Sequence, residues 1–175
     1  MAGKPRQAEE TAVKNESLPS RQTKEKKTMD IRKFKELIAK REKIHPEDYL
    51  TIEHCDKELI DVLCEDMPGT IKYLYSECTV EEFLWLSEFF EETVARVPDM
   101  GYVDGLRYLA QKYPKETKEY RVEYFLNSAQ YLIEEIEAQN WPLVKEVVPE
   151  ASVPALREWL RSHGKLNENQ PQGGA

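Results

Sequence analysis

The sequence contains none of the short motifs that mark nucleotide, hydrolytic or zinc chemistry. It has no P-loop, no G-x-G-x-x-G fingerprint, no nucleophile elbow and no H-E-x-x-H motif. Glycine is scarce, with 7 residues in 175, so little backbone is suited to a phosphate-cradling loop. These absences argue against an enzyme and give no reason to expect a cofactor.

Histidine and cysteine are also few, and their spacing does not predict a metal site. The Glu-x-x-His spacing of di-iron bundles occurs once, at Glu42 and His45, whereas such bundles need two copies and two further glutamates. The cysteines Cys55, Cys64 and Cys78 lack the short paired spacing of zinc ligands. We therefore expect no bound metal and three buried, free thiols.

Long apolar runs are missing as well. No stretch resembles a signal peptide or a transmembrane segment, and the number of cysteines is odd. This combination favours a reducing environment. We expect a cytoplasmic protein that does not insert into a membrane.

The two ends of the chain are poor in large apolar residues. Residues 1–28 contain only Val13 and Leu18 of that kind, and their seven lysines and arginines against four glutamates give a net charge of +3. The sequence predicts a disordered basic arm over 1–28, one domain over 29–164 and a disordered tail over 165–175. The arm is interpreted as a solvated tail, as a contact for nucleic acid or as a segment that folds back onto an acidic surface.

Positive charge is nearly absent between residues 53 and 92. This stretch holds twelve carboxylates against Lys57 and Lys72, a net charge of −10, while the whole chain carries −8. Phosphates would be repelled by such a body, so direct binding of nucleic acid or anionic lipid by the folded part is disfavoured. A basic protein is the partner that this charge favours.

Apolar residues recur with helical spacing along the whole domain, and no alternating strand pattern extends beyond four residues. The sequence predicts an all-α fold of about seven helices, either a compact bundle or a short helical-repeat-like array. The clearest helix is expected over 79–97, where Thr79 and Glu82 form a capping box. A second long helix is expected over 117–139, and the two align at an offset of 42 residues, which is compatible with a repeat.

Each of these two helices has a predicted core stripe and a second aromatic face. The first stripe comprises Phe83, Leu86, Ser87, Phe90, Val94 and Val97, and the second comprises Val122, Phe125, Ala129, Leu132, Ile133 and Ile136. Trp85 and Phe89 fall on the opposite arc of the first helix. On the second helix the opposite positions are Tyr120, Tyr124, Asn127, Tyr131 and Glu134. Either these helices are packed on both sides, or the second faces recognise a partner.

The run Glu77–Glu88 (ECTVEEFLWLSE), the run Ala110–Glu116 (AQKYPKE) and the tyrosine-rich helix after them resemble a known family. This region, about residues 54–137, is similar to small acidic all-helical immunity proteins of bacterial toxin–immunity pairs. The resemblance implies a cytoplasmic inhibitor that binds a cationic toxin domain, often a nuclease, and blocks it.

The sequence therefore predicts a non-catalytic, acidic protein-binding protein. The first hypothesis is an inhibitor or immunity protein that neutralises a basic toxin or nuclease domain by occlusion. The alternative is a helical scaffold or adaptor that binds a peptide or subunit. Trp85 and Phe89 are expected to be central anchors, with carboxylates as a steering rim. The candidate partner-binding residues are Asp61, Glu65, Glu81, Trp85, Glu88, Phe89, Glu92, Tyr120, Tyr124, Tyr131 and Glu134.

Overall fold

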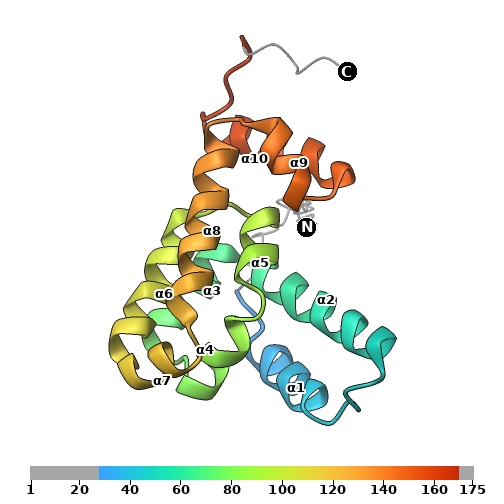
Figure 1. Cartoon of the computed structure of the whole chain (residues 1–175), viewed down its shortest axis with the longest axis vertical. Helices are drawn as coiled ribbons and strands as arrows, with labels where there is room; N and C mark the ends of the chain where they lie inside the picture. Colours follow the sequence, from blue (N-terminus) through green and yellow to red (C-terminus); the bar gives the residue numbers. More distant parts are fainter. Residues whose placement is uncertain (1–27, 170–175) are drawn as a thin grey trace, which may run out of the picture.

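The computed structural model describes residues 28–169, and helices are the only regular elements in that range (Figure 1). The elements are α1 (Ile31–Arg41), α2 (Tyr49–Glu65), α3 (Met67–Ser76), α4 (Val80–Leu86), α5 (Phe90–Arg96), α6 (Met100–Lys112), α7 (Pro114–Glu119), α8 (Val122–Glu137), α9 (Trp141–Val147), the 3₁₀ turn η1 (Glu150–Ser152) and α10 (Val153–Ser162). The predicted all-α class is confirmed. The predicted count of about seven is wrong, because the described residues form ten α-helices. The expected disordered arm, apart from Thr28, and the tail beyond Asn169 lie outside the described residues.

Two helices that the sequence predicts as continuous are each divided. The 79–97 segment forms α4 and α5, and residues 87–89 between them do not continue the helix. The 117–139 segment is interrupted before α8, where Arg121 has a φ of 54°. A left-handed conformation costs a non-glycine residue roughly 1–2 kcal/mol. Neither break contains proline or glycine, and at the first of them the Ser87 hydroxyl donates to the Leu84 carbonyl at 2.6 Å.

Several helices begin where a side chain satisfies a free backbone amide. Asp30, Asp48 and Asp99 each accept a hydrogen bond from an amide in the first turn, at 2.9, 3.2 and 2.8 Å. The predicted capping box is present at α4: the Glu82 amide donates to Thr79 Oγ1 at 3.3 Å, and the Thr79 amide donates to Glu82 Oε2 at 3.0 Å. Each such cap stabilises a helix by about 1 kcal/mol.

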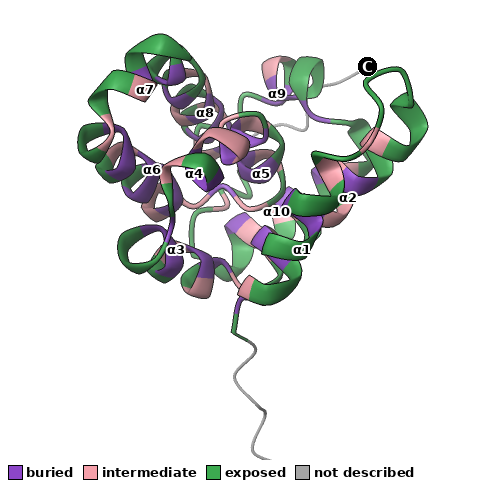
Figure 2. Ribbon diagram, turned by 90° about the horizontal axis from the view of Figure 1, so that it is seen from below, coloured by how far each residue is buried: buried purple, intermediate pink, exposed green. Residues whose placement is uncertain are grey.

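The helices pack both with their neighbours in the chain and with helices distant in sequence. α8 lies against α5, α6, α7 and α9, while α3 packs on α6 and α1 on α2. Figure 2 shows the buried residues on the inward faces of these helices. Where α3 meets α6, a Cβ on Gly105 would lie 2.9 Å from Leu74 Cδ1, so the missing side chain permits this close approach.

The predicted core stripes are mostly buried, with three exceptions. Ser87 and Val97 are half-buried, and Phe125 is 39% exposed. Leu126 occupies the inward position instead of Phe125 and is fully buried. The offset of 42 residues pairs Phe83, which is buried, with Phe125, which is not, so the alignment that suggested a repeat does not hold at this position.

The α1–α2 pair and the α9–α10 pair project on either side of α5 (Figure 1). α10 contacts α5, and α2 also contacts α5. This arrangement places three segments, far apart in the chain, around one hollow. Among the described residues, no helix is both long and apolar enough to cross a lipid bilayer.

Candidate functional site

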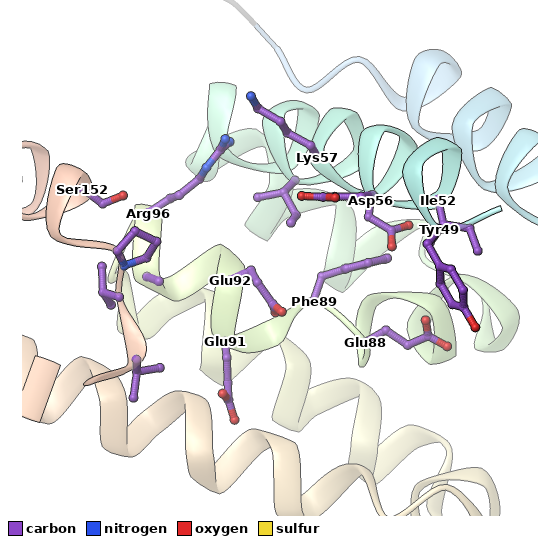
Figure 3. A pocket seen from close by; sticks show the side chains of 16 residues that line it. Tyr49, Ile52, Asp56, Lys57, Glu88, Phe89, Glu91, Glu92, Arg96 and Ser152 are labelled. Atoms are coloured by element: carbon purple, nitrogen blue, oxygen red, sulfur yellow. The ribbon is translucent and has the colours of Figure 1, made fainter. Parts of the chain in front are cut away.

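A cleft of about 710 Å³ lies between α2, the segment 88–96 and the connection from α9 to α10. Tyr49 and Glu88 lie at one end of it, and Arg96 and Ser152 lie at the other (Figure 3). We call it the α2–α5 cleft. Its size is within the range of small-molecule and peptide sites.

The α2 wall follows from the spacing of residues along that helix. The lining positions Tyr49, Ile52, Glu53, Asp56, Lys57 and Ile60 recur at three- and four-residue intervals, which places them on one face. The buried residues Cys55, Leu59 and Val62 lie on the arc next to it, and Leu63 is buried beyond its C-terminal end. α2 is therefore anchored through one face while the other remains open to a ligand.

The second wall depends on the break between α4 and α5. Phe89 is only 5% exposed, and it forms part of the apolar floor of the cleft. Glu88, Glu91 and Glu92 surround it, and Figure 3 shows Phe89 directed from this wall toward α2. A continuous helix was expected to carry Phe89 outward, whereas the break allows it to turn inward beside the buried Phe90.

The third wall comes from residues near the C-terminal end of the domain. Val147, Val148 and Pro149 line the cleft, and the Val147 side chain is 52% exposed. Together with Ile52 and Ile60 they give the cleft an apolar surface beneath its charged rim. An occupant with both apolar and charged groups would match this combination.

The cleft carries an excess of negative charge. Five carboxylates line it, from Glu53, Asp56, Glu88, Glu91 and Glu92, against two bases, Lys57 and Arg96. Asp56 is paired with Arg41 at 2.7 Å, and Arg96 is paired with Asp61 outside the lining. Glu53, Glu88, Glu91 and Glu92 form no ion pair with any residue in the range 28–169.

The surroundings of Glu88 shift the pKa of its carboxyl group. Partial burial raises the pKa of its carboxyl group above the ordinary value, the Arg41 guanidinium opposes that rise, and the Asp56 charge adds to it. An added positive charge would relieve the cost of keeping Glu88 ionised there.

Three of the eleven candidate partner-binding residues, Glu88, Phe89 and Glu92, line the cleft. Asp61 sits at its edge through the pair with Arg96, and Glu65 is exposed near the end of α2. Of the two alternatives for Phe89, the structure shows the packed one, because its ring is 5% exposed and belongs to the core while it also lines the cleft.

Trp85 is not a free surface anchor either. It is half-buried against the core, its Nε1 donates to Glu42 Oε1 at 3.2 Å, and the Arg41 guanidinium lies 5.5 Å from its ring centre. The tryptophan thus joins α4 to the end of α1. Glu81, in the first turn of α4, is exposed and lies outside the cleft lining.

The remaining candidates form a second surface on α7 and α8. Tyr120, Tyr124 and Tyr131 are 54, 71 and 50% exposed, and Glu134 accepts a hydrogen bond from Gln130 Nε2 at 2.8 Å. None of these four lines the α2–α5 cleft. The candidate residues therefore do not share one surface: Glu88, Phe89 and Glu92 line the cleft, whereas the other eight lie outside its lining.

Sequence reasoning missed part of the site. Glu53, Asp56 and Glu91 belong to the acidic stretch but were not singled out, although the three- and four-residue spacing along α2 marks Glu53 and Asp56 as one face. Val147 and Val148 had no local signal at all, because only the packing of α9 and α10 brings them to the cleft.

Among residues 28–169, no three histidine, cysteine, aspartate or glutamate side chains are grouped so that they could hold a metal ion. Comparisons with protein-family models, with characterised proteins and with solved structures found no match to this chain.

Proposed function

We propose that this chain is a non-catalytic inhibitor or immunity protein, which binds a cationic segment of a basic protein, such as a toxin or nuclease domain, in the α2–α5 cleft. The observation that carries the proposal is the set of four carboxylates without an ion-pair partner among the described residues, Glu53, Glu88, Glu91 and Glu92, placed around an apolar floor. The chemistry of the site favours lysine or arginine carried on a segment that also has apolar side chains.

Charge and apolar contact would contribute in different ways. Carboxylates accept short, charge-assisted hydrogen bonds from lysine and arginine. Their combined field also raises the rate of encounter with a basic partner, on the order of 10- to 1,000-fold at low salt. Phe89, Val147 and the other apolar lining groups would contribute burial once the partner is seated.

Inhibition follows by occlusion. A nuclease or toxin uses its basic residues to hold phosphate groups, and carboxylates that occupy those residues prevent that contact. The free cysteines fit a reducing compartment, and we include a cytoplasmic location in the proposal.

A specific observation favours the second candidate, a helical adaptor. The exposed tyrosines of α7 and α8 form a surface separate from the cleft, so the chain has two places at which partners could bind. Tyrosine is enriched at binding hot spots. An adaptor would use both surfaces at once, whereas an inhibitor needs only the cleft to block its target.

The test compares three immobilised full-length chains for the proteins they retain from a cell extract. The wild type is compared with E53Q/E88Q/E91Q/E92Q, which neutralises the cleft, and with a control, E77Q/D104N/E119Q/E168Q, which removes four exposed acids outside the cleft. We expect one basic protein to bind the wild type and the control, and to be lost from the cleft variant.

The retained protein is then assayed for its own activity with the chain added. Loss of its activity at one equivalent supports the inhibitor, and unchanged activity with simultaneous binding at the tyrosine surface supports the adaptor. The association rate constant should fall steeply with salt while dissociation changes less. Equal retention by the wild type and the cleft variant would contradict the proposed site.

A further inference from the structure

The N-terminal arm of this chain contains a positively charged segment, and the α2–α5 cleft is negatively charged. Residues 18–24 hold two bases, Arg21 and Lys24, no acid, and one large apolar residue, Leu18, and two further lysines follow at 26 and 27. The cleft has an apolar floor and five carboxylates against two bases. The two are complementary in charge, and both combine charge with apolar side chains.

The position at which the described chain begins makes this contact reachable. Met29 is buried at the corner between α2 and α3, where its backbone nitrogen lies 2.9 Å from the place a Cβ on Gly69 would occupy. From Asp66 at that corner back to Ile60, the near end of the cleft on α2, is about 9 Å at a rise of 1.5 Å per residue. About three extended residues cover that distance.

The length of the segment also matches the cleft. The lining stretch of α2 from Ile60 to Tyr49 is about 16 Å long by the same rise per residue. Five or six extended residues span it. With residues 25–28 as the connection, residues 18–24 would extend along the whole cleft.

We propose that residues 18–24 of this chain, joined to the domain through residues 25–28, bind intramolecularly in the α2–α5 cleft and compete with the basic partner. The inference rests on the proposed function, because it assigns a regulator to the same site. Tethering gives the segment an effective concentration on the order of millimolar, so even a weak contact would be occupied for a substantial part of the time. The partner then binds only the fraction of molecules whose cleft is vacant.

The first measurement uses backbone amide chemical shifts of the full-length chain. R21E/K24E reverses two charges in the proposed segment, and K4E/R6E reverses the same number at the far end of the arm as a matched control. We expect R21E/K24E to shift the amides of Glu53, Glu88 and Glu92, and K4E/R6E to leave them unchanged. Identical spectra of all three chains in this region would overturn the proposal.

The second measurement uses a synthetic peptide of residues 17–27 as a probe added to the same three chains. A vacant cleft binds it more readily, so we expect R21E/K24E to bind the probe about two- to tenfold more tightly than the wild type or K4E/R6E. Equal affinities would overturn the proposal. Shifts that grow with protein concentration would also overturn it, because the segment would then come from a second copy.

Failure of this inference is distinguishable from failure of the proposed function. If the probe binds all three chains equally, and neutralising the cleft with E53Q/E88Q/E91Q/E92Q abolishes probe and partner binding, the self-contact is excluded and the partner site remains. If neutralising the cleft affects neither probe nor partner, the proposed function itself fails.

Discussion

At the scale of single residues, Glu82 is the carboxylate on which the fold depends most directly. It is 8% exposed, caps α4 through the Thr79 amide, accepts a hydrogen bond from the Tyr73 hydroxyl and pairs with Lys35 at 3.5 Å. Most of the other acids in the stretch from residue 53 to 92 are exposed or half-buried. Glu82 therefore belongs to the structure and not to the binding surface.

Replacing Glu82 with alanine should be strongly destabilising. The change removes the capping interaction and leaves the buried Tyr73 hydroxyl without its acceptor, at a combined cost of about 2–4 kcal/mol in the free energy of unfolding. Urea denaturation of Glu82→Ala and of the exposed neighbour Glu81→Ala measures the difference. An equal effect of the two substitutions would show that the buried network contributes little.

Because two thiols have raised pKa values, we expect the protein to lose stability in alkaline solution. Burial raises the pKa of Cys64 to about 11, with Arg96 opposing the rise, and raises the pKa of Cys78 to about 12, with the Glu82 charge adding to it. Because the folded pKa values exceed the unfolded value of about 9, the unfolded state loses protons first as the pH rises. The stabilisation that these two thiols contribute is fully present below about pH 9 and is lost between about pH 9 and pH 12.

Urea unfolding at about pH 8.5 and about pH 10.5 tests this expectation. The unfolding free energy of the wild type should fall over that interval, and that of Cys64→Ala/Cys78→Ala should fall less. Parallel decreases in both proteins would assign the alkaline loss to other groups.

At the scale of elements, the break between α4 and α5 places the Phe89 ring in the core. Phe89→Ala should lower the unfolding free energy by about 3–5 kcal/mol, because it removes a ring from the core. Tyr124→Ala, which truncates a 71% exposed ring, should change it by no more than about 0.5 kcal/mol. Thermal or urea unfolding of the two variants is the measurement, and a small effect at Phe89 would contradict its burial.

The elements also show what the sequence could predict and what it could not. The capping box at Thr79 and the apolar spacing of α8 are local signals, and they correctly indicated helices and most of the core. The breaks at residues 87–89 and at Arg121 lack proline and glycine, so the usual helix-breaking residues did not predict them. The break determines which way Phe89 faces. Predicting one continuous helix over 79–97 therefore also gave the wrong direction for the Phe89 side chain.

The charge of the site was more predictable than its shape. The excess of carboxylates between residues 53 and 92 is visible in the sequence, and two of the predicted partner-binding acids, Glu88 and Glu92, line the cleft. The third wall required the folded chain, because Val147 and Glu53 are distant in sequence and meet only through packing of α9 and α10.

At the scale of the whole molecule, the third wall is held by residues outside the cleft. Trp141 at the start of α9 is 6% exposed, and the Arg157 guanidinium of α10 lies 4.6 Å from its ring centre. This contact connects α9 to α10, and α9 packs on α8. The position of Val147 therefore depends on Trp141, which does not line the cleft.

Trp141→Ala should cost about 3–5 kcal/mol of unfolding free energy and also weaken binding of the basic partner. Trp141→Phe keeps an aromatic ring in place and should restore most of both properties. Binding is measured at a temperature where all variants remain folded, so that stability and affinity are separated. Unchanged affinity of folded Trp141→Ala would show that the third wall does not contribute to recognition.

The wide sequence separation of the three walls also has a consequence during synthesis. A ribosome produces α2 and α5 long before Val147 and Val148, so a growing chain has two walls of the cleft for several seconds without the third. The complete cleft therefore forms only after α9 and α10 have been made and packed. Under the proposed inhibitor function, a target made at the same moment would stay active over that delay.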